Sequence, residues 1–172
     1  MSEQKRTLVV MRHAKAEQNG STDFERRLAE RGERDGRAVG AWLAGQGVQP
    51  DLALVSAAVR TQQTWEAVAE GAGWDAELAT YDESLYAAGP ESALDVVREV
   101  EDAVRTLVVV GHNPTMAYLA QLLDDGDGDE DASAEMVAGY PTSATTVFTV
   151  EGDWADLDEA GARVVAFHVG RG

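Results

Sequence analysis

Histidine and arginine side chains follow directly after two apolar segments of the chain. Arg12 and His13 come after residues 7–11, and residues 106–110 precede a Gly-His-Asn sequence that contains His112. A neutral imidazole can act as a nucleophile or transfer protons near pH 7. A guanidinium binds phosphate through two parallel hydrogen bonds. The two segments therefore carry the residue types that phosphoryl chemistry needs.

A third apolar segment, residues 52–55, ends in Ser56 and leads to Arg60. All three segments are short and continuously apolar, which is typical of strands buried on both faces of a parallel sheet. Such sheets bind ligands outside the carboxyl ends of their strands, so these arginines and histidines should meet at one edge. A helix that begins after His112 adds N–H donors and a favourable dipole. The arrangement predicts a site for a dianionic tetrahedral group.

The elements that must position these residues alternate between strands and helices. Apolar spacing predicts helices over residues 28–46, 59–71 and 92–105, and a fourth helix from Pro114. Residues 145–150 and 163–169 alternate like an antiparallel pair of strands, and the charged, glycine-containing residues 124–135 between the last helix and this pair are expected to form a mobile loop. We therefore predict one α/β domain over residues 1–172. Its fold is a three-layer α/β/α arrangement with a mainly parallel central sheet and an antiparallel edge from the C-terminal strands.

The composition excludes several classes of function. The 172 residues carry a formal charge of −17, from 31 acidic and 14 basic residues, so no binding to nucleic acid is expected. No apolar run approaches the roughly 18 residues that span a membrane, and no apolar signal segment follows the opening MSEQKR. We therefore expect a cytoplasmic protein without a membrane partner. The chain has no cysteine, which excludes disulfides and thiolate metal sites.

Three short sequences carry a resemblance to a known family. LVVMRHAKAEQN, SAAVRTQQT and LVVVGHNP occur in the order that is usual for the histidine phosphatase superfamily. RHA in place of the commoner RHG, together with RRLAERG and GHNP, resembles the branch of SixA-like phosphohistidine phosphatases in particular. The resemblance covers about residues 7–125 well and the remaining part loosely. It implies a phosphoglycerate mutase-like fold and a metal-independent phosphatase.

The resemblance also implies roles for individual residues. His13 matches the nucleophile, which takes the phosphoryl group on one ring nitrogen and later yields it to water, while a backbone carbonyl orients the other nitrogen. Arg12 and Arg60 match the phosphate-binding arginines, and His112 matches a second histidine that donates to the same phosphoryl group. Three further positions are expected to contribute to the phosphate pocket: Asn19, Arg26 and Ser56.

The general acid is the open point of this interpretation. An alcohol leaving group needs a proton, and Glu83 stands where phosphomonoesterases of the superfamily carry the acid, with Tyr86 at a mutase-like spacing. SixA-like proteins often manage without such an acid, because an imidazole leaves phosphorus more easily than an alkoxide does. Glu83 is therefore either the general acid or a surface carboxylate beside Asp82.

Several functions remain open at this point, as does the oligomeric state. The leading hypothesis is a phosphatase that hydrolyses phosphohistidine in a protein, without a cofactor. The second takes a small phosphomonoester such as a sugar phosphate or a nucleotide, and the third is a phosphate-binding module without catalysis. A metal hydrolase that uses His13, His112 and His168 ranks last, because no short metal-ligand spacing such as HExxH occurs. His168 itself is predicted to be structural.

Overall fold

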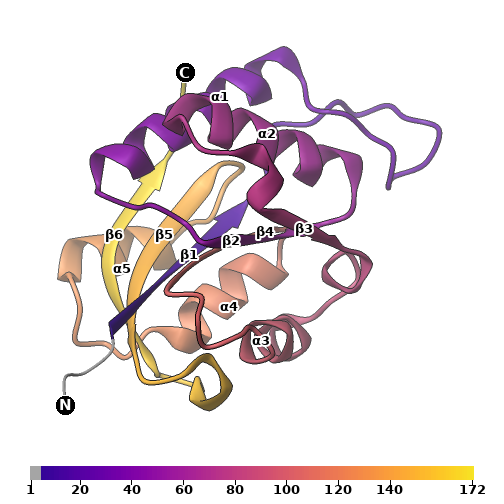
Figure 1. Ribbon diagram of the computed structural model, residues 1–172. Coiled ribbons are helices and arrows are strands. Elements are labelled where there is room, and N and C mark those ends of the chain that lie inside the picture. Colours follow the sequence, from indigo (N-terminus) through magenta and orange to yellow (C-terminus); the bar gives the residue numbers. More distant parts are fainter. Residues whose placement is uncertain (1–4) are drawn as a thin grey trace.

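The centre of the molecule is a six-stranded mixed sheet. In the computed structural model, which describes residues 5–172, the strand order is β3-β2-β4-β1-β5-β6 (Figure 1). The strands are β1 (Lys5–Arg12), β2 (Leu52–Ser56), β3 (Ala79–Asp82), β4 (Thr106–Gly111), β5 (Ala144–Glu151) and β6 (Ala162–Val169). β1, β4, β2 and β3 pair in parallel, whereas β5 pairs antiparallel with β1, and β6 with β5. The predicted sheet is therefore confirmed.

Helices cover both faces of this sheet. They are α1 (Glu30–Gly45), α2 (Val59–Ala72), α3 (Pro90–Arg98), α4 (Thr115–Leu123) and α5 (Glu130–Ala138), with short 3-10 turns η1 (Ala76–Leu78), η2 (Glu83–Leu85) and η3 (Trp154–Asp156). Figure 1 shows α1 and α2 on one face of the sheet and α3 and α4 on the other, while α5 packs beside β6. The predicted three-layer α/β/α architecture is confirmed.

Alternation along β1 explains why both faces need a helical layer. Val9 and Met11 point to one face, into a core that includes Trp65 of α2. Leu8 and Val10 point to the other face, into the core that β1 shares with α3, α4 and α5. All four β1 side chains are fully buried. A strand with no polar face is stable only between two layers, and its two ends are then fixed within the sheet.

The helices α1 and α2 touch at glycines. A Cβ atom on Gly40 of α1 would lie 2.0 Å from the carbonyl oxygen of Val68, and one on Gly71 of α2 would lie 2.1 Å from the carbonyl oxygen of Arg37. Such distances are far inside van der Waals contact, so only glycine permits this approach. The contact fixes how α2, which carries Arg60 in its first turn, sits on the sheet.

One expectation for the C-terminal half is wrong. The loop expected over residues 124–135 is shorter: residues 124–129 connect α4 to α5, and residues 130–135 belong to α5, which begins at Glu130. The Asp129 carboxylate caps this helix by accepting a hydrogen bond from the Ala132 N–H, at 2.9 Å. Ala132 and Met136, one turn apart, bury their side chains in the core. The acidic composition of the segment hid this apolar stripe.

Other boundaries differ from the prediction in smaller ways. The helix expected over residues 92–105 ends at Arg98, and α4 begins one residue after Pro114. The edge strand β3 was not predicted, because its four residues, two of them exposed, give no strong periodic signal. Residues 1–4 lie outside the described residues, so the domain boundary at residue 1 and the interpretation of the N-terminus stay predictions.

Candidate active site

The three predicted strand ends do meet at one edge of the sheet. Arg12, the last residue of β1, is paired with Gly111, the last residue of β4. The N–H of His13 donates to the Gly111 carbonyl at 3.0 Å, which continues the ladder past the end of the strand. Ser56, the last residue of β2, contacts the His112 ring. Parallel pairing of the three strands therefore brings the residues together, as the sequence predicts.

His13 is held in one tautomer by its own backbone. Its Nδ1 lies 2.7 Å from the carbonyl oxygen of Ala14, and because a carbonyl only accepts, Nδ1 carries the proton. The other nitrogen, Nε2, then keeps its lone pair. Burial lowers the pKa of His13 to about 4, and the positive charges of Arg60 and Arg12 add to this effect. The ring is therefore neutral at pH 7, as a nucleophile must be.

His112 lies against His13 and is neutral as well. The two ring centroids are 5.4 Å apart. Burial, followed by the neighbouring His13, lowers the pKa of His112 to about 3. Its Nε2 lies 2.8 Å from the hydroxyl oxygen of Ser56, which already accepts a long hydrogen bond from the Ala58 N–H. The Ser56 hydroxyl, with one proton and two lone pairs, can donate to Nε2 or accept from it, and Nδ1 of His112 is buried without a partner among residues 5–172.

The two predicted arginines have different surroundings. Arg60, 5% exposed, donates from Nη1 to the carbonyl oxygen of Asp23 at 2.7 Å and from Nη2 to the Asp23 carboxylate at 3.1 Å. Arg12 donates only a long hydrogen bond, 3.3 Å, to the carbonyl oxygen of Tyr140. No carboxylate oxygen of the described chain lies within 4.0 Å of the Arg12 guanidinium. Burial and the positive charge of Arg60 lower the Arg12 pKa, yet an arginine stays charged at pH 7.

Asp23 is the main residue that the sequence interpretation missed. Its carboxylate accepts from Arg60, from the Tyr86 hydroxyl at 2.6 Å and from Nε of Arg26 at 3.1 Å. The Tyr86 hydrogen bond, together with the charge of Arg60, lowers the Asp23 pKa to about 2. Only the spacing of three residues between Asp23 and Arg26 hinted at a pair, since Arg60 and Tyr86 are distant in sequence.

The remaining predicted residues lie near the site with looser contacts. Arg26 reaches it only through Asp23, and its Nη1 donates to the carbonyl oxygen of Glu17. Asn19 is exposed, and its side chain makes no hydrogen bond within residues 5–172. Glu83 opens η2 at the same edge, but its exposed carboxylate also bonds to no described residue. The roles predicted for these three residues therefore stay predictions.

Backbone contacts around His13 complete the site and were also not foreseen. The N–H of Ala14 donates to the hydroxyl of Thr64 on α2, at 3.0 Å. The N–H of Ser143, just before β5, donates to the His13 carbonyl at 3.1 Å. The Tyr140 carbonyl that accepts from Arg12 also accepts from the Asn113 side chain, at 2.7 Å. These bonds fix the nucleophile from elements that lie far away in the sequence.

The arrangement can carry out phosphoryl transfer to a side chain. A neutral imidazole with a free Nε2 stands beside two guanidinium groups and a second neutral imidazole. No group of three or more His, Cys, Asp or Glu residues within residues 5–172 is arranged to hold a metal ion. His168, the third histidine, stacks on Trp42 with ring centroids 4.7 Å apart, away from the other two. Across the same residues, every helix is too short or too polar to cross a membrane.

Known proteins match both the sequence and the structure. The sequence profile of the histidine phosphatase superfamily (branch 1) matches residues 8–86. An uncharacterized protein of Mycobacterium tuberculosis is 41% identical over 94% of this chain and 100% of its own length. The structure of a provisionally named phosphohistidine phosphatase SixA from Nakamurella multipartitia is 32% identical and covers 96% of each chain, with a TM-score of 0.83. Phosphohistidine phosphatase SixA of Escherichia coli is 28% identical over 69% of this chain and 74% of its own.

Proposed function

This chain belongs to the histidine phosphatase superfamily and is a phosphatase, and from that premise we propose that it hydrolyses phosphohistidine in a protein substrate through a phosphoryl intermediate on His13. The likeness to SixA proteins supports the substrate class. The geometry around His13, His112, Arg12 and Arg60 supports the chemical route.

In the first step, the lone pair on Nε2 of His13 forms a bond to phosphorus while the bond between phosphorus and the substrate imidazole breaks. The leaving imidazole takes up a proton from solvent. Arg12 and Arg60 offset the charge on the equatorial phosphoryl oxygens, and His112, in the tautomer that carries its proton on Nδ1, donates to one of them. The Ala14 carbonyl holds the proton of His13 on Nδ1, which gains positive charge as the new P–N bond forms.

In the second step, water attacks the same phosphorus atom. The bond from phosphorus to Nε2 of His13 breaks, the water gives one proton to solvent, and inorganic phosphate leaves as HPO₄²⁻. His13 returns to the neutral tautomer with its proton on Nδ1, held by the Ala14 carbonyl. Atoms and charge balance over the two steps without a metal or another cofactor.

The observation that carries the substrate class is that both oxygens of the Asp23 carboxylate already accept hydrogen bonds. This carboxylate is joined to both Arg26 and Arg60, and its pKa of about 2 leaves it without a proton to donate at pH 7. Glu83 forms no contact with the arginines. An imidazole bound to phosphorus leaves with less help than an alkoxide does, so such a site suits a P–N bond better than a P–O bond.

A second candidate function keeps the route and takes a small phosphomonoester. A surface cavity of about 450 Å³, lined by Gln18, Gly20, Thr22, Asp23 and Arg26, adjoins the phosphate-binding residues and offers room for a sugar or nucleoside. Glu83, on the same sheet edge, would then have to reach the leaving oxygen as the acid. A cytoplasmic location, expected from the sequence, suits either substrate.

The test compares a phosphohistidine peptide, a phosphoserine peptide and a sugar phosphate, each in EDTA, with wild type and with His13→Ala. We expect turnover of phosphohistidine at least 10³-fold above that of the two esters, and loss of that turnover in the variant. Efficient turnover of the esters would favour the small-substrate function. If no compound is turned over while inorganic phosphate still binds, the chain is a binding module.

A further inference from the structure

The guanidinium of Arg60 donates two hydrogen bonds to a single residue, Asp23. Nη1 donates to the carbonyl oxygen of Asp23 at 2.7 Å, and Nη2 donates to its carboxylate at 3.1 Å. Both terminal nitrogens are thus engaged on the side of the guanidinium that faces the loop. Nε is left buried without a partner among the described residues. Three of the five N–H groups of Arg60 then remain without an acceptor within residues 5–172: Nε–H and one on each terminal nitrogen.

The same carboxylate also ties Arg60 to the second histidine. Oδ2 of Asp23 accepts from the Tyr86 hydroxyl at 2.6 Å, as well as from Arg60. The Tyr86 ring lies 6.0 Å from the Arg60 guanidinium carbon and packs edge-on against His112, with ring centroids 5.4 Å apart. Phe24 covers another side of the Tyr86 ring, at 5.0 Å. Asp23 therefore bonds to Arg60 and Tyr86 directly, and through the Tyr86 ring it is linked to His112.

We propose that Asp23 is a positioning residue that fixes the guanidinium of Arg60 in the orientation that binds the transferred phosphoryl group. The inference rests on the proposed function, because it assigns Arg60 to that step. A free arginine side chain samples many rotamers, and transition-state donors act best when they are oriented before the reaction. Two hydrogen bonds that Arg60 donates to Asp23 remove that freedom.

A direct chemical role for Asp23 conflicts with its surroundings. Both carboxylate oxygens already accept hydrogen bonds, from Arg26, Arg60 and Tyr86. The group stays ionised at neutral pH because the Tyr86 hydroxyl and Arg60 lower its pKa, so it has no proton to give. A bare carboxylate would repel phosphate. Any gain in rate from Asp23 must therefore pass through the groups that it holds.

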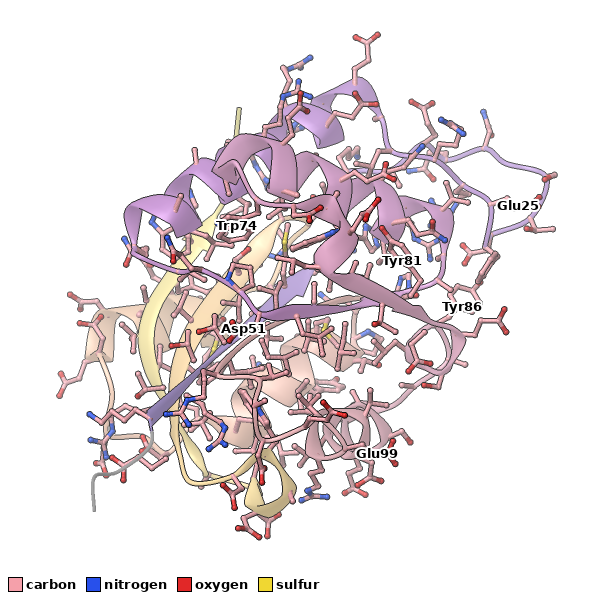
Figure 2. All side chains as sticks on the ribbon, viewed as in Figure 1. Glu25, Asp51, Trp74, Tyr81, Tyr86 and Glu99 are labelled. Atoms are coloured by element: carbon pink, nitrogen blue, oxygen red, sulfur yellow. The ribbon has the colours of Figure 1, made fainter. Side chains whose placement is uncertain are left out.

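The loop supplies a matched control. Glu25 lies two residues away in the same exposed loop, and its carboxylate bonds only to the Ser21 hydroxyl. Figure 2 shows Glu25 at the outer part of this loop, away from Tyr86. Glu25→Ala therefore removes the same charge from the same segment without touching Arg60.

Turnover of the phosphohistidine peptide measures the effect. We expect kcat to fall about 10- to 100-fold in Asp23→Ala, and to fall less in Asp23→Asn, because an amide oxygen can still accept one of the bonds. Glu25→Ala should keep the wild-type rate. The wild-type rate itself tests the proposed function, so an unchanged rate in Asp23→Ala would overturn only the role of Asp23.

A double-mutant cycle separates positioning of Arg60 from a general structural effect. Arg60→Lys removes the forked donor that Asp23 holds. If Asp23 acts through Arg60, then adding Asp23→Ala to Arg60→Lys should lower kcat less than threefold further. A full, multiplicative loss in the double variant would show that Asp23 acts independently of Arg60 and would overturn the proposal.

Discussion

The two ends of β1 each carry an arginine, and the two are used in opposite ways. Arg6, at the start of the strand, donates to the carbonyl oxygens of Gly152 and Asp102 and pairs with the Asp153 carboxylate at 3.5 Å. Its guanidinium also lies over the Trp154 ring. Arg12, at the other end, has one long hydrogen bond to a carbonyl and no carboxylate within ion-pair distance in the described chain.

The two ends differ in the partners of their arginines: Arg6 is held by two carbonyl groups and two carboxylates, whereas the charge of Arg12 is not paired within residues 5–172. Both arginines belong to a chain that holds 31 acidic residues against 14 basic ones. At the start of β1, the charge of Arg6 is balanced by the carboxylates of Asp102 and Asp153. Arg12 keeps its charge available at the edge where His13 and His112 meet. The following predictions test that contrast.

Among variants at the two ends of β1, Arg12→Ala should have the largest effect on catalysis. Loss of one donor to the transferred phosphoryl group is expected to lower kcat/KM by about 10²- to 10³-fold. Thermal stability should change little, because the side chain makes only one long hydrogen bond. Kinetics and a melting curve, with Arg27→Ala as the control for an exposed arginine, measure both. A near-wild-type rate would place Arg12 outside the site.

Arg6→Ala should lower stability and leave catalysis nearly unchanged. We expect the free energy of unfolding to fall by about 2–3 kcal/mol, since two carbonyl partners lose a buried charged donor. The value of kcat/KM should stay within about twofold. Urea unfolding of Arg6→Ala and Arg6→Met separates the charge from the stem, because methionine keeps the apolar packing on Trp154. A large loss of activity at unchanged stability would contradict the contrast.

Acidification should lower kcat/KM only in a narrow pH range, because His13 and His112 beside Arg12 are protonated late. The pKa values of His13 and His112 are lowered to about 4 and about 3, so kcat/KM should stay level from pH 8 to about 5 and fall only near pH 4. An unshifted histidine would give a fall near pH 6.5. The His13→Ala variant gives the blank for acid hydrolysis of the substrate.

The same shifts have a consequence for stability, with a fixed sign. Both folded-state pKa values lie below the unfolded value of about 6.5, so the unfolded chain binds more protons between pH 6.5 and 4. The free energy of unfolding should therefore decrease as the pH falls through this window. Urea titrations at pH 7 and pH 5 measure it, and a smaller decrease in His13→Ala would assign part of the effect to that ring.

Glu83→Gln should have the smallest effect. With a phosphohistidine peptide we expect less than a threefold change in kcat, because the carboxylate is exposed and bonds to none of the site residues. The phosphoserine peptide provides the contrast, since an ester needs an acid. A large loss on both substrates would make Glu83 the general acid after all and favour the small-ester function.

Local patterns predicted most of the fold. The continuous apolar runs of β1, β2 and β4 are buried on both faces, as the sequence pattern predicts for strands of a parallel sheet. The prediction failed where tertiary contacts outweigh composition, as in α5. There, Ala132 and Met136 form a buried stripe within an acidic segment, and the cap from Asp129 starts the helix. The edge strand β3 is held by pairing with β2 rather than by its own sequence.

The site was predictable only where chemistry follows a strand. His13, Arg12 and His112 stand at strand ends, and the rule for parallel sheets places such residues together. Asp23 lies in an irregular loop, and its partners Arg60 and Tyr86 are 37 and 63 residues away, so no local spacing could reveal it. The carbonyl that orients His13 was expected, whereas the bonds from Thr64 and Ser143 were not.

The glycine contact between α1 and α2 gives the chain a way to change its activity from a distance. Val68, which touches Gly40, lies eight residues after Arg60 on α2, about 12 Å along the helix axis. A methyl group at Gly40 would clash with the Val68 carbonyl oxygen, so α1 and α2 would have to move apart, and α2 carries Arg60 in its first turn. Selection for a new substrate therefore has a route that leaves every residue of the site unaltered.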